Sequence, residues 1–569
     1  MKLLSILISI TFLPSNVVFA QQETWITNVR LVDPARKTVQ YGMTVVFSGN
    51  VITAVHKRKA PKNVTTVDAG GKYLMPGLTD AHIHFFQSGG LYTRPDFIDL
   101  RKIRPYEDEI KAVHKGLEQQ LRRYVQNGIT TVYDVGTTYH FLSRKKEMEG
   151  WAVAPQVYMA GPIITTAANP VYDSLKNDAP FMRATTPVEG RRLVEEQLAY
   201  QPDLIKLVFR PQGKAPAAYM PIIKAVIEQA HLRGLRVAVH ATARIAAQLA
   251  TAAGADFLVH SVGDEVLDDA FVALLKKKKV IVCPTLLMED GYLHTFDQSR
   301  VFTTRELTYA EPFALGSLYD LKQLPDTAIA GQYKIKAGEH MAPTAAINRT
   351  SQLNLKKLSD AGVPIVSGTD AGNIGTLHAV SLLPELLQMQ QSGMSNWQVL
   401  QAATVNAAGI LNRPGYTGSI AAGQPADMLL LDGDPSADLS QLAHIRLVIR
   451  KGQVISPDTV IHDSPESLVQ RQLNAYNSRN MDAFLATYAE DAELLNFPDK
   501  LLRKGKEQIR KAYFFFDIAQ ILHCRIVKRI VEGNNVIDEE HIVDDHGTRR
   551  GTAIYQIEKE KIKSVYFVK

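Results

Sequence analysis

Short apolar runs alternate with helix-like stretches through the middle of the chain. Each run has the length of a buried strand, and the segment after it has the spacing of an amphipathic helix. The eight runs are GLTDAHIH (77–84), GITTVYDVG (128–136), QVYMAG (156–161), DLIKLVF (203–209), LRVAVHA (235–241), DFLVHS (256–261), VIVCPT (280–285) and VPIVSGTD (363–370). Strands that alternate with helices form parallel βαβ units, so the pattern predicts a (β/α)8 TIM barrel over residues 76–410.

The regions on both sides of this barrel have a different pattern. Residues 21–75 consist of short β-rich runs separated by turns, and a matching β-rich patch returns over residues 411–463. Because the two patches enclose the barrel sequence, we expect both ends to form one small composite β-sandwich domain. The pattern changes again in residues 464–569, where two helix-like segments precede several alternating runs. This order predicts a separate C-terminal α+β domain of about 100 residues, a usual domain size.

One connection within the barrel region is unusually long. Residues 289–348 separate the seventh and eighth predicted strands and contain helix-like sequence. Two interpretations remain open for this segment: a helical lid over the mouth of the barrel, and an insertion with no part in the site.

The first twenty residues, MKLLSILISITFLPSNVVFA, place a lysine before an apolar stretch and end on small residues. The apolar stretch is too short to span a bilayer, so the pattern predicts a cleaved signal peptide over residues 1–20. No later segment offers about 20 uninterrupted apolar residues. We therefore expect a periplasmic or secreted protein with no membrane association after cleavage.

Composition and charge narrow the function classes. The 569 residues are 46% hydrophobic and carry a formal net charge of +6, which is small for this length. No basic stripe with interleaved aromatic residues indicates nucleic-acid binding. The two cysteines, Cys283 and Cys524, fall in different predicted domains, so we expect buried thiols and no disulfide framework.

Ionisable residues gather on the predicted barrel strands, most of them at the strand ends. The set is His82, His84, Lys206, His240, His260 and Asp370. The first two lie one residue apart on the first strand, so both imidazoles face the same side of the sheet. Each residue alone has an ordinary explanation, such as a helix cap for the aspartate. The lysine is harder to explain in this way, because an unpaired buried ammonium is costly.

Taken together, the four imidazoles and the carboxylate form a typical metal-binding set. Catalytic groups in TIM barrels come from the C-terminal ends of the strands, which all lie on one face. Nitrogen and oxygen ligands of this kind suit zinc or a similar divalent metal. Such a metal lowers the pKa of bound water toward about 7 and polarises a carbonyl oxygen, while a nearby carboxylate transfers the proton. The set therefore predicts hydrolysis.

These residues and their neighbours resemble a known family, the amidohydrolase superfamily. Within it, the chain is most similar to the branch with imidazolonepropionase-like proteins and metal-dependent Xaa-Pro dipeptidases. The motifs that carry the resemblance are MPGLTDAHIH, IKL, VHA, VHS and SGTDAG, with ATVNAAGIL and GSIAAGQPADMLLLDGDP near the end of the region. The resemblance covers about residues 25–455 and implies a metal-dependent hydrolase.

The resemblance also implies a role for each histidine and for the aspartate. His82, His84 and Asp370 would bind one divalent metal ion, with zinc as the expected metal. His240 and His260 would bind a second ion. Asp370 would also serve as the general base that moves a proton to the leaving nitrogen.

Lys206 falls where the binuclear members carry a lysine carboxylated by carbon dioxide. Its carbamate would bridge the two metals, which would explain a lysine in an apolar strand. A hydroxide bridging the metals would then attack the amide carbonyl of a dipeptide or an N-acyl amino acid.

Two features depart from relatives in this family. Deaminase members with one metal place a glutamate three residues after the fifth-strand histidine, where this chain has Ala243. Dipeptidase-like members often carry a Gly-Gly-His stretch where this chain reads TTAANPVY (165–172). We therefore expect a different substrate pocket. Arg210 and Tyr219 are candidates to bind a substrate carboxylate, because arginine presents a planar fork of donors. A surface salt bridge is the alternative for Arg210.

The C-terminal domain resembles the SnoaL-like and ketosteroid-isomerase-like cone fold. The resemblance rests on AYNSRNMDAFLATYAEDAEL, RKGKEQIRKAY and the terminal IKSVYFV. Proteins of this fold include isomerases and pure binding modules, so the fold alone does not give a role, and we expect an accessory domain.

Other functions and partners stay open at this point. The same site could hydrolyse a lactone or cyclic imide, or the protein could bind a ligand through its C-terminal domain with the barrel as a scaffold. The expected partner is a small-molecule substrate, and a homo-oligomer is left open.

Overall fold

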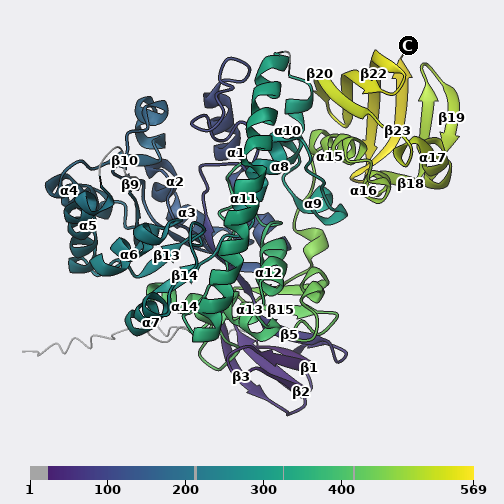
Figure 1. Ribbon diagram of the computed structural model, residues 1–569. Coiled ribbons are helices and arrows are strands. Elements are labelled where there is room, and N and C mark those ends of the chain that lie inside the picture. Colours follow the sequence, from purple (N-terminus) through teal and green to yellow (C-terminus); the bar gives the residue numbers. More distant parts are fainter. Residues whose placement is uncertain (1–22, 210–214, 325, 414–416, 569) are drawn as a thin grey trace, which may run out of the picture.

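The computed structural model describes residues 23–209, 215–324, 326–413 and 417–568 (Figure 1). The strands β1, β2 and β3 and the C-terminal strands lie at opposite ends of the view, with the long helix α11 between them. The predicted signal peptide lies outside the described residues. None of the described helices is both long enough and apolar enough to cross a bilayer.

Eight parallel strand positions form the wall of the barrel. Seven of them are β6 (Leu78–Ile83), β7 (Ile129–Asp134), β8 (Gln156–Met159), β11 (Leu204–Val208), β12 (Arg236–His240), β13 (Phe257–Val259) and β14 (Ile281–Cys283). The eighth is an extended segment, residues 363–371. Strands β6 to β8 form one sheet, and β11 to β14 belong to another. A single parallel bridge between Ala160 and Leu204 joins the two sheets. The eighth segment connects to β14 through a bridge between Val282 and Ile365, and to β6 through one between Ile83 and Ala371. The strands follow the order predicted from the sequence, and the TIM-barrel fold is confirmed.

Helices cover the outside of these strands. They are α1 (Tyr106–Gln126), α2 (Tyr139–Ser143), α3 (Lys145–Gly150), α4 (Pro187–Leu198), α5 (Met220–Leu232), α6 (Arg244–Ala253), α7 (Asp269–Lys278), α12 (Leu382–Gln391), α13 (Asn396–Ala402) and α14 (Ala408–Leu411). Their boundaries follow local chemistry. Thr186 and Glu189 form a capping box at the start of α4, and Gly254 takes the left-handed conformation that ends α6.

The connection after the third barrel strand contains structure that the sequence did not predict. Two three-residue strands, β9 (Ile163–Thr165) and β10 (Phe181–Arg183), add to the edge of β11, and the 3-10 helix η1 (Pro170–Asp178) joins them. Strands this short show no recognisable alternation. This connection lies beside the barrel mouth, because Ile163 and Phe181 line the cavity described below.

Both flanks of the barrel region contribute to one sheet, as predicted. The N-terminal flank supplies β1 (Glu23–Asp33), β2 (Thr38–Ser48), β3 (Val51–His56), β4 (Thr65–Asp68) and β5 (Tyr73–Pro76). The other flank supplies β15 (Met428–Leu431), β16 (Ile445–Arg450) and β17 (Gln453–Ile455). The strand order is β17-β16-β15-β5-β1-β2-β3, with β4 beside β1, so hydrogen bonding makes one continuous sheet instead of two separate ones. The antiparallel pairing of β5 with β15 joins the two flanks.

The long connection before the eighth barrel segment is helical. It contains α8 (Met288–Phe296), α9 (Thr304–Tyr309), α10 (Pro312–Ser317), the 3-10 helix η3 (Asp320–Lys322) and α11 (Thr327–Ala361). Side chains from α8 and α11 line the cavity at the barrel mouth. Of the two interpretations of this segment, the structure therefore favours the lid.

The C-terminal domain has the predicted α+β composition. Its helices are α15 (Pro465–Asn477), α16 (Met481–Ala486) and α17 (Lys506–Ala512), and its strands are β18 (Tyr488–Asn496), β19 (Lys500–Lys504), β20 (Leu522–Glu532), β21 (Asn535–Asp544), β22 (Gly547–Glu558) and β23 (Lys561–Val568). The strands form one sheet in the order β19-β18-β23-β22-β21-β20. Arg471 donates to the carbonyls of Leu307 at 3.1 Å and Ala310 at 2.9 Å, and Asn474 donates to that of Pro312 at 2.7 Å. The domain thus rests on the lid segment.

Candidate active site

The first barrel strand carries two of the predicted metal ligands into the interior. All six residues of β6 are buried, and the alternation of a strand turns Asp80, His82 and His84 toward the same side. His82 is completely buried, and His84 is 6% exposed and lines the cavity. The strand therefore holds the His84 imidazole at the cavity wall, with the fully buried His82 imidazole next to it.

Asp80 positions the segment that carries the aspartate ligand. Its carboxylate accepts hydrogen bonds from the backbone N–H of Thr369 at 3.0 Å and from the Thr369 hydroxyl at 2.8 Å. Burial raises the pKa of Asp80 to about 7, although these hydrogen bonds lower it. A Cβ at Gly368 would lie 2.5 Å from the sulfur of Cys283, so only glycine allows this close approach. The eighth segment is thereby fixed beside β6.

Asp370 lies at the centre of the group. Its backbone N–H donates to the carbonyl of His82 at 2.7 Å, and it takes a left-handed φ of 58°. Its Oδ1 lies 3.2 Å from Nε2 of His82 and 3.0 Å from Nε2 of His84, and the two Nε2 atoms are 3.2 Å apart. Three ligand atoms thus form a triangle with nearly equal sides.

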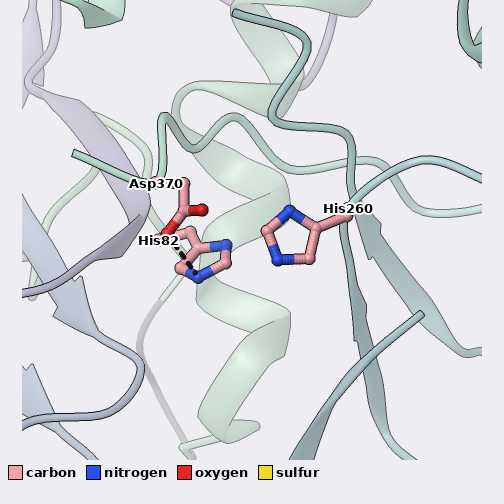
Figure 2. A group of neighbouring side chains, drawn as sticks. All are labelled: His82, His260 and Asp370. Carbon is pink, nitrogen blue, oxygen red and sulfur yellow. Dashed lines mark ion pairs between the residues drawn. The ribbon is translucent and has the colours of Figure 1, made fainter. Parts of the chain in front are cut away.

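The other two histidines lie beside this triangle, and the ring centroids of His82 and His260 are 4.9 Å apart. Figure 2 shows the ring of His260 facing His82 and Asp370, and one ligand atom from each of the three lies within 4.8 Å of the others. The ring of His240 packs edge-on against that of His260, with centroids 4.4 Å apart. Nδ1 of His260 lies 2.7 Å from the hydroxyl of Thr285, which orients the ring. The structure therefore brings the four predicted histidines together.

Lys206 is buried among these groups. It lies on β11, is 2% exposed and contributes to the lining of the cavity. Burial lowers its pKa to about 8, while the charge of Asp370 raises it. The neutral amine is therefore well populated at mildly alkaline pH, and only a neutral amine can react with carbon dioxide.

The donor set fits a divalent metal ion. Nδ1 of His84 lies 2.7 Å from the carbonyl oxygen of Gly136, so this nitrogen carries the proton and Nε2 presents its lone pair. That lone pair points at the equally electron-rich Oδ1 of Asp370, which has no hydrogen-bond partner among the described residues. A cation between them removes the repulsion. With bonds of about 2.1 Å, ligand atoms around zinc are about 3.4 Å apart, close to the sides of this triangle.

All of the candidate ligands except His82 line a cavity of about 640 Å³, a size typical of small-molecule sites. Phenylalanine and tyrosine rings form part of its wall. The aromatic lining residues are Phe86, Phe97, Phe181, Tyr292, Phe296 and Tyr333. Glu289 and Lys336 from the lid helices add charges, so the cavity suits a substrate with a large apolar group and a few polar ones.

Arg94 is a cavity residue that the sequence analysis missed. It forms a two-point ion pair with Asp96 at 2.8 Å, and it donates to Asn373 at 2.5 Å and to the hydroxyl of Tyr292 at 3.1 Å. Asn373 in turn donates to the carbonyl of Asp370 at 3.2 Å. The arginine thus ties lid helix α8 to the loop that holds Asp370. Its place on an irregular loop left no periodic signal, although Asn373 follows the SGTD motif closely.

The structure describes only one of the two predicted substrate-binding residues. Arg210 lies outside the described residues. Tyr219 ends the 3-10 helix η2 (Pro216–Tyr219), is 7% exposed and packs against Phe209 with ring centroids 6.5 Å apart. The structure places Tyr219 in the hydrophobic core and not among the residues that line the cavity.

Comparison with known proteins bears on the whole barrel region. The model of the amidohydrolase family matches residues 73–455, about two thirds of the chain. The chain belongs to the amidohydrolase family. A SnoaL-like domain model matches residues 469–565, which confirms the predicted similarity of the C-terminal domain.

Individual relatives of this amidohydrolase are distant. An imidazolonepropionase of Shouchella clausii is 23% identical over 456 residues, which cover 75% of this chain and 86% of the relative. An uncharacterized protein of Mycobacterium bovis is 27% identical over 243 residues, 43% of this chain and about half (54%) of the relative's length. A solved Xaa-Pro dipeptidase with bound methionine superposes with a TM-score of 0.58 at 23% identity, covering 76% of this chain and all of the other. These similarities support the fold, and the match to the amidohydrolase family model supports a hydrolase acting on carbon–nitrogen bonds.

Glu385 gives the amidohydrolase a testable pH dependence. This fully buried residue of α12 accepts hydrogen bonds from the backbone N–H groups of Leu286 at 2.8 Å and Leu287 at 3.1 Å. Burial raises its pKa from 4.5 to about 8, although these bonds lower it. The folded state therefore binds this proton more tightly than the unfolded state, so its contribution to stability is full below the unfolded pKa and is lost as pH rises toward 8.

We expect the melting temperature to fall between pH 5 and 8, and the fall to be smaller in Glu385→Gln. Differential scanning fluorimetry across this range measures both slopes. Glu490→Gln, at an 87% exposed side chain, is the control and should keep the wild-type slope. Equal slopes in all three proteins would assign the pH dependence to other groups.

Proposed function

We propose that this amidohydrolase cleaves the amide bond of a dipeptide or N-acyl amino acid with the help of two divalent metal ions, zinc in the simplest case. The observation that carries the proposal is the convergence of Asp370 Oδ1 on the Nε2 atoms of His82 and His84 at 3.0–3.2 Å, beside a cavity that His84 and Asp370 line. We further propose that the protein works in the periplasm or outside the cell, because residues 1–20 have the pattern of a signal peptide.

The ligands divide into two groups. His82, His84 and Asp370 would hold the first ion, and His240 and His260 the second. When bound, such ions polarise the substrate carbonyl and make water nucleophilic near neutral pH. Lys206 can react as its neutral amine with carbon dioxide, forming an N–C bond and releasing a proton, and the resulting carbamate offers two oxygens for the space between the two groups.

Asp370 is placed to move the proton. Its Oδ1 lacks a hydrogen-bond partner among the described residues, and the residue lines the cavity at the end of its strand segment. A carboxylate here takes a proton from the attacking water and delivers it to the leaving nitrogen. The hydrogen bonds of Asp80 to Thr369 hold the neighbouring backbone during this exchange.

The cavity wall favours a substrate with an aromatic or large apolar group. Six aromatic rings line it, and burying such a group against them removes apolar surface from water. Lys336 of α11 lines the same cavity and offers a cation to a substrate carboxylate. The similarity to a Xaa-Pro dipeptidase is consistent with a substrate of this kind.

A panel of substrates tests the proposal. We expect the zinc-loaded protein to release free amine from N-aroyl and N-acyl amino acids and from dipeptides, with kcat/KM about tenfold higher for aromatic acyl groups than for acetyl. Matched lactones and cyclic imides are assayed in parallel, with Asp370→Asn protein as the control for contaminating hydrolases. Faster turnover of a lactone or imide than of every amide would replace the proposed substrate class.

A further inference from the structure

A second cluster of metal-ligand side chains lies outside the proposed catalytic centre. His114 on α1, His140 on α2 and Asp178 at the end of η1 each bring one ligand atom within 4.8 Å of the others. Nε2 of His114 lies 3.0 Å from Oδ1 of Asp178, and the rings of the two histidines stack with centroids 3.8 Å apart. All three residues are half-buried, so the cluster lies just beneath the surface.

We propose that His114, His140 and Asp178 bind a divalent transition metal ion, zinc being the best fit, in a structural site that fastens η1 to α1 and α2. Two imidazoles and a carboxylate are preferred zinc ligands, and water completes four-fold coordination. Zinc bonds of about 2.1 Å place ligand atoms about 3.4 Å apart. The 3.0 Å pair is close to this spacing. The His140 ring stacks parallel to that of His114, so it must turn out of this stack for its nitrogen to face the same ion.

The charges around the cluster permit a cation. Arg144 is a positive group close to the cluster, since it donates to the backbone carbonyl of His114 at 3.4 Å. Its guanidinium forms a two-point ion pair with Glu147, with both bonds at 2.8 Å, so its charge is compensated.

The cluster has two connections to the catalytic cavity. Phe86 forms part of the cavity wall, and a small void behind it is also lined by His114 and Asp178. The second connection starts on η1 itself, where the hydroxyl of Tyr172 donates to Asp96 at 2.6 Å. Asp96 is the ion-pair partner of Arg94, which lines the cavity. A metal that fixes η1 thus also fixes the carboxylate that orients Arg94.

An ordinary ion pair is the alternative explanation for these contacts, and the chain contains a suitable control for it. Nε2 of His231 lies 2.8 Å from Oδ2 of Asp256, in a pair that belongs to none of the three-ligand groups among the described residues. If a His–Asp pair alone bound zinc, replacing His231 would lower the metal content. Replacing His140 by phenylalanine keeps a ring for stacking on His114 but removes the third ligand.

Metal content tests the proposal directly. The full chain is saturated with zinc chloride, dialysed against metal-free buffer and analysed by inductively coupled plasma mass spectrometry. We expect His140→Phe and Asp178→Asn each to contain one zinc equivalent fewer than the wild type, and His231→Phe to contain the wild-type amount. Equal zinc content in His140→Phe and His231→Phe would overturn the proposal. Because the readout is stoichiometry, the outcome does not depend on the proposed substrate.

Proteolysis adds a readout of the structural role. Lys176 lies within η1, close to Asp178, so trypsin cleavage after Lys176 reports how often this segment opens. We expect a chelator to accelerate this cleavage at least tenfold in the wild type and to have little further effect in His140→Phe. Chelator-independent cleavage in the wild type would show that no metal holds η1, and a chelator effect of equal size in both proteins would assign it to the catalytic centre.

Discussion

Asp370→Asn is expected to lower turnover about a thousand-fold, within the usual contribution of acid–base catalysis, while the protein keeps at least part of its metal. Asparagine tolerates the left-handed φ of 58° at this position, so the backbone at the end of the eighth segment should be preserved. The amide oxygen can still coordinate weakly, but an amide cannot accept the proton that a carboxylate accepts. The variant thus removes proton transfer while the backbone and at least part of the metal stay in place.

Steady-state kinetics across pH and metal analysis of the same preparation measure this effect. Asp432→Asn serves as the control, because Asp432 pairs with Lys72 in the composite sheet, is half-exposed and should leave both turnover and metal content unchanged. Near-normal turnover of Asp370→Asn across the pH range would remove Asp370 from the proton-transfer role, whatever its metal content.

Replacing Lys206 is expected to remove about one metal equivalent and most of the activity. A charged ammonium aimed at two divalent ions is repelled by them, whereas a carbamate on the same nitrogen attracts both. The pKa of about 8 that burial gives Lys206 makes its neutral amine available for this reaction. Lys206→Ala should regain part of its activity when short carboxylic acids occupy the space left by the side chain.

Lys206→Met is the matched variant, since methionine fills a similar volume and cannot be carboxylated. If both variants lose one metal equivalent but only the alanine variant is rescued by added acid, the loss comes from the missing carbamate and not from a cavity in the core. A crystallographic map of the zinc-loaded protein should show density continuing beyond Nζ of Lys206. A bare amine with one metal on His82, His84 and Asp370 would replace the binuclear site with a mononuclear one.

The barrel and the closeness of His82 to His84 could be predicted from the sequence because both have periodic signals. Buried parallel strands appear as short apolar runs, and the two-residue spacing of His82 and His84 places both rings on one face. The same two-residue spacing extends back to Asp80, which the structure shows in contact with Thr369. The sequence pattern therefore also indicated Asp80 as a residue on the same face.

The cavity wall could not be predicted in this way. Arg94 and Asn373 lie on irregular loops, and Tyr292 lies on a lid helix whose position depends on tertiary contacts. Their spacing along the chain gives no indication that they meet. Tyr219 is an example of a prediction that packing did not support. Its loop position near a strand end suggested a substrate contact, but its ring packs against Phe209 in the core.

The composite sheet has a consequence for how the chain must be synthesised and folded. β5 pairs with β15, although the whole barrel sequence lies between them, and the barrel itself closes only when Ala371 reaches Ile83. Contacts of such long range make folding slow. Until the ribosome has added residues 428–431, the growing chain exposes an unpaired edge of β5, a template for aggregation. Any shortened version made for expression should therefore end after β17, because a cut before β15 leaves β5 without the strand that pairs with it.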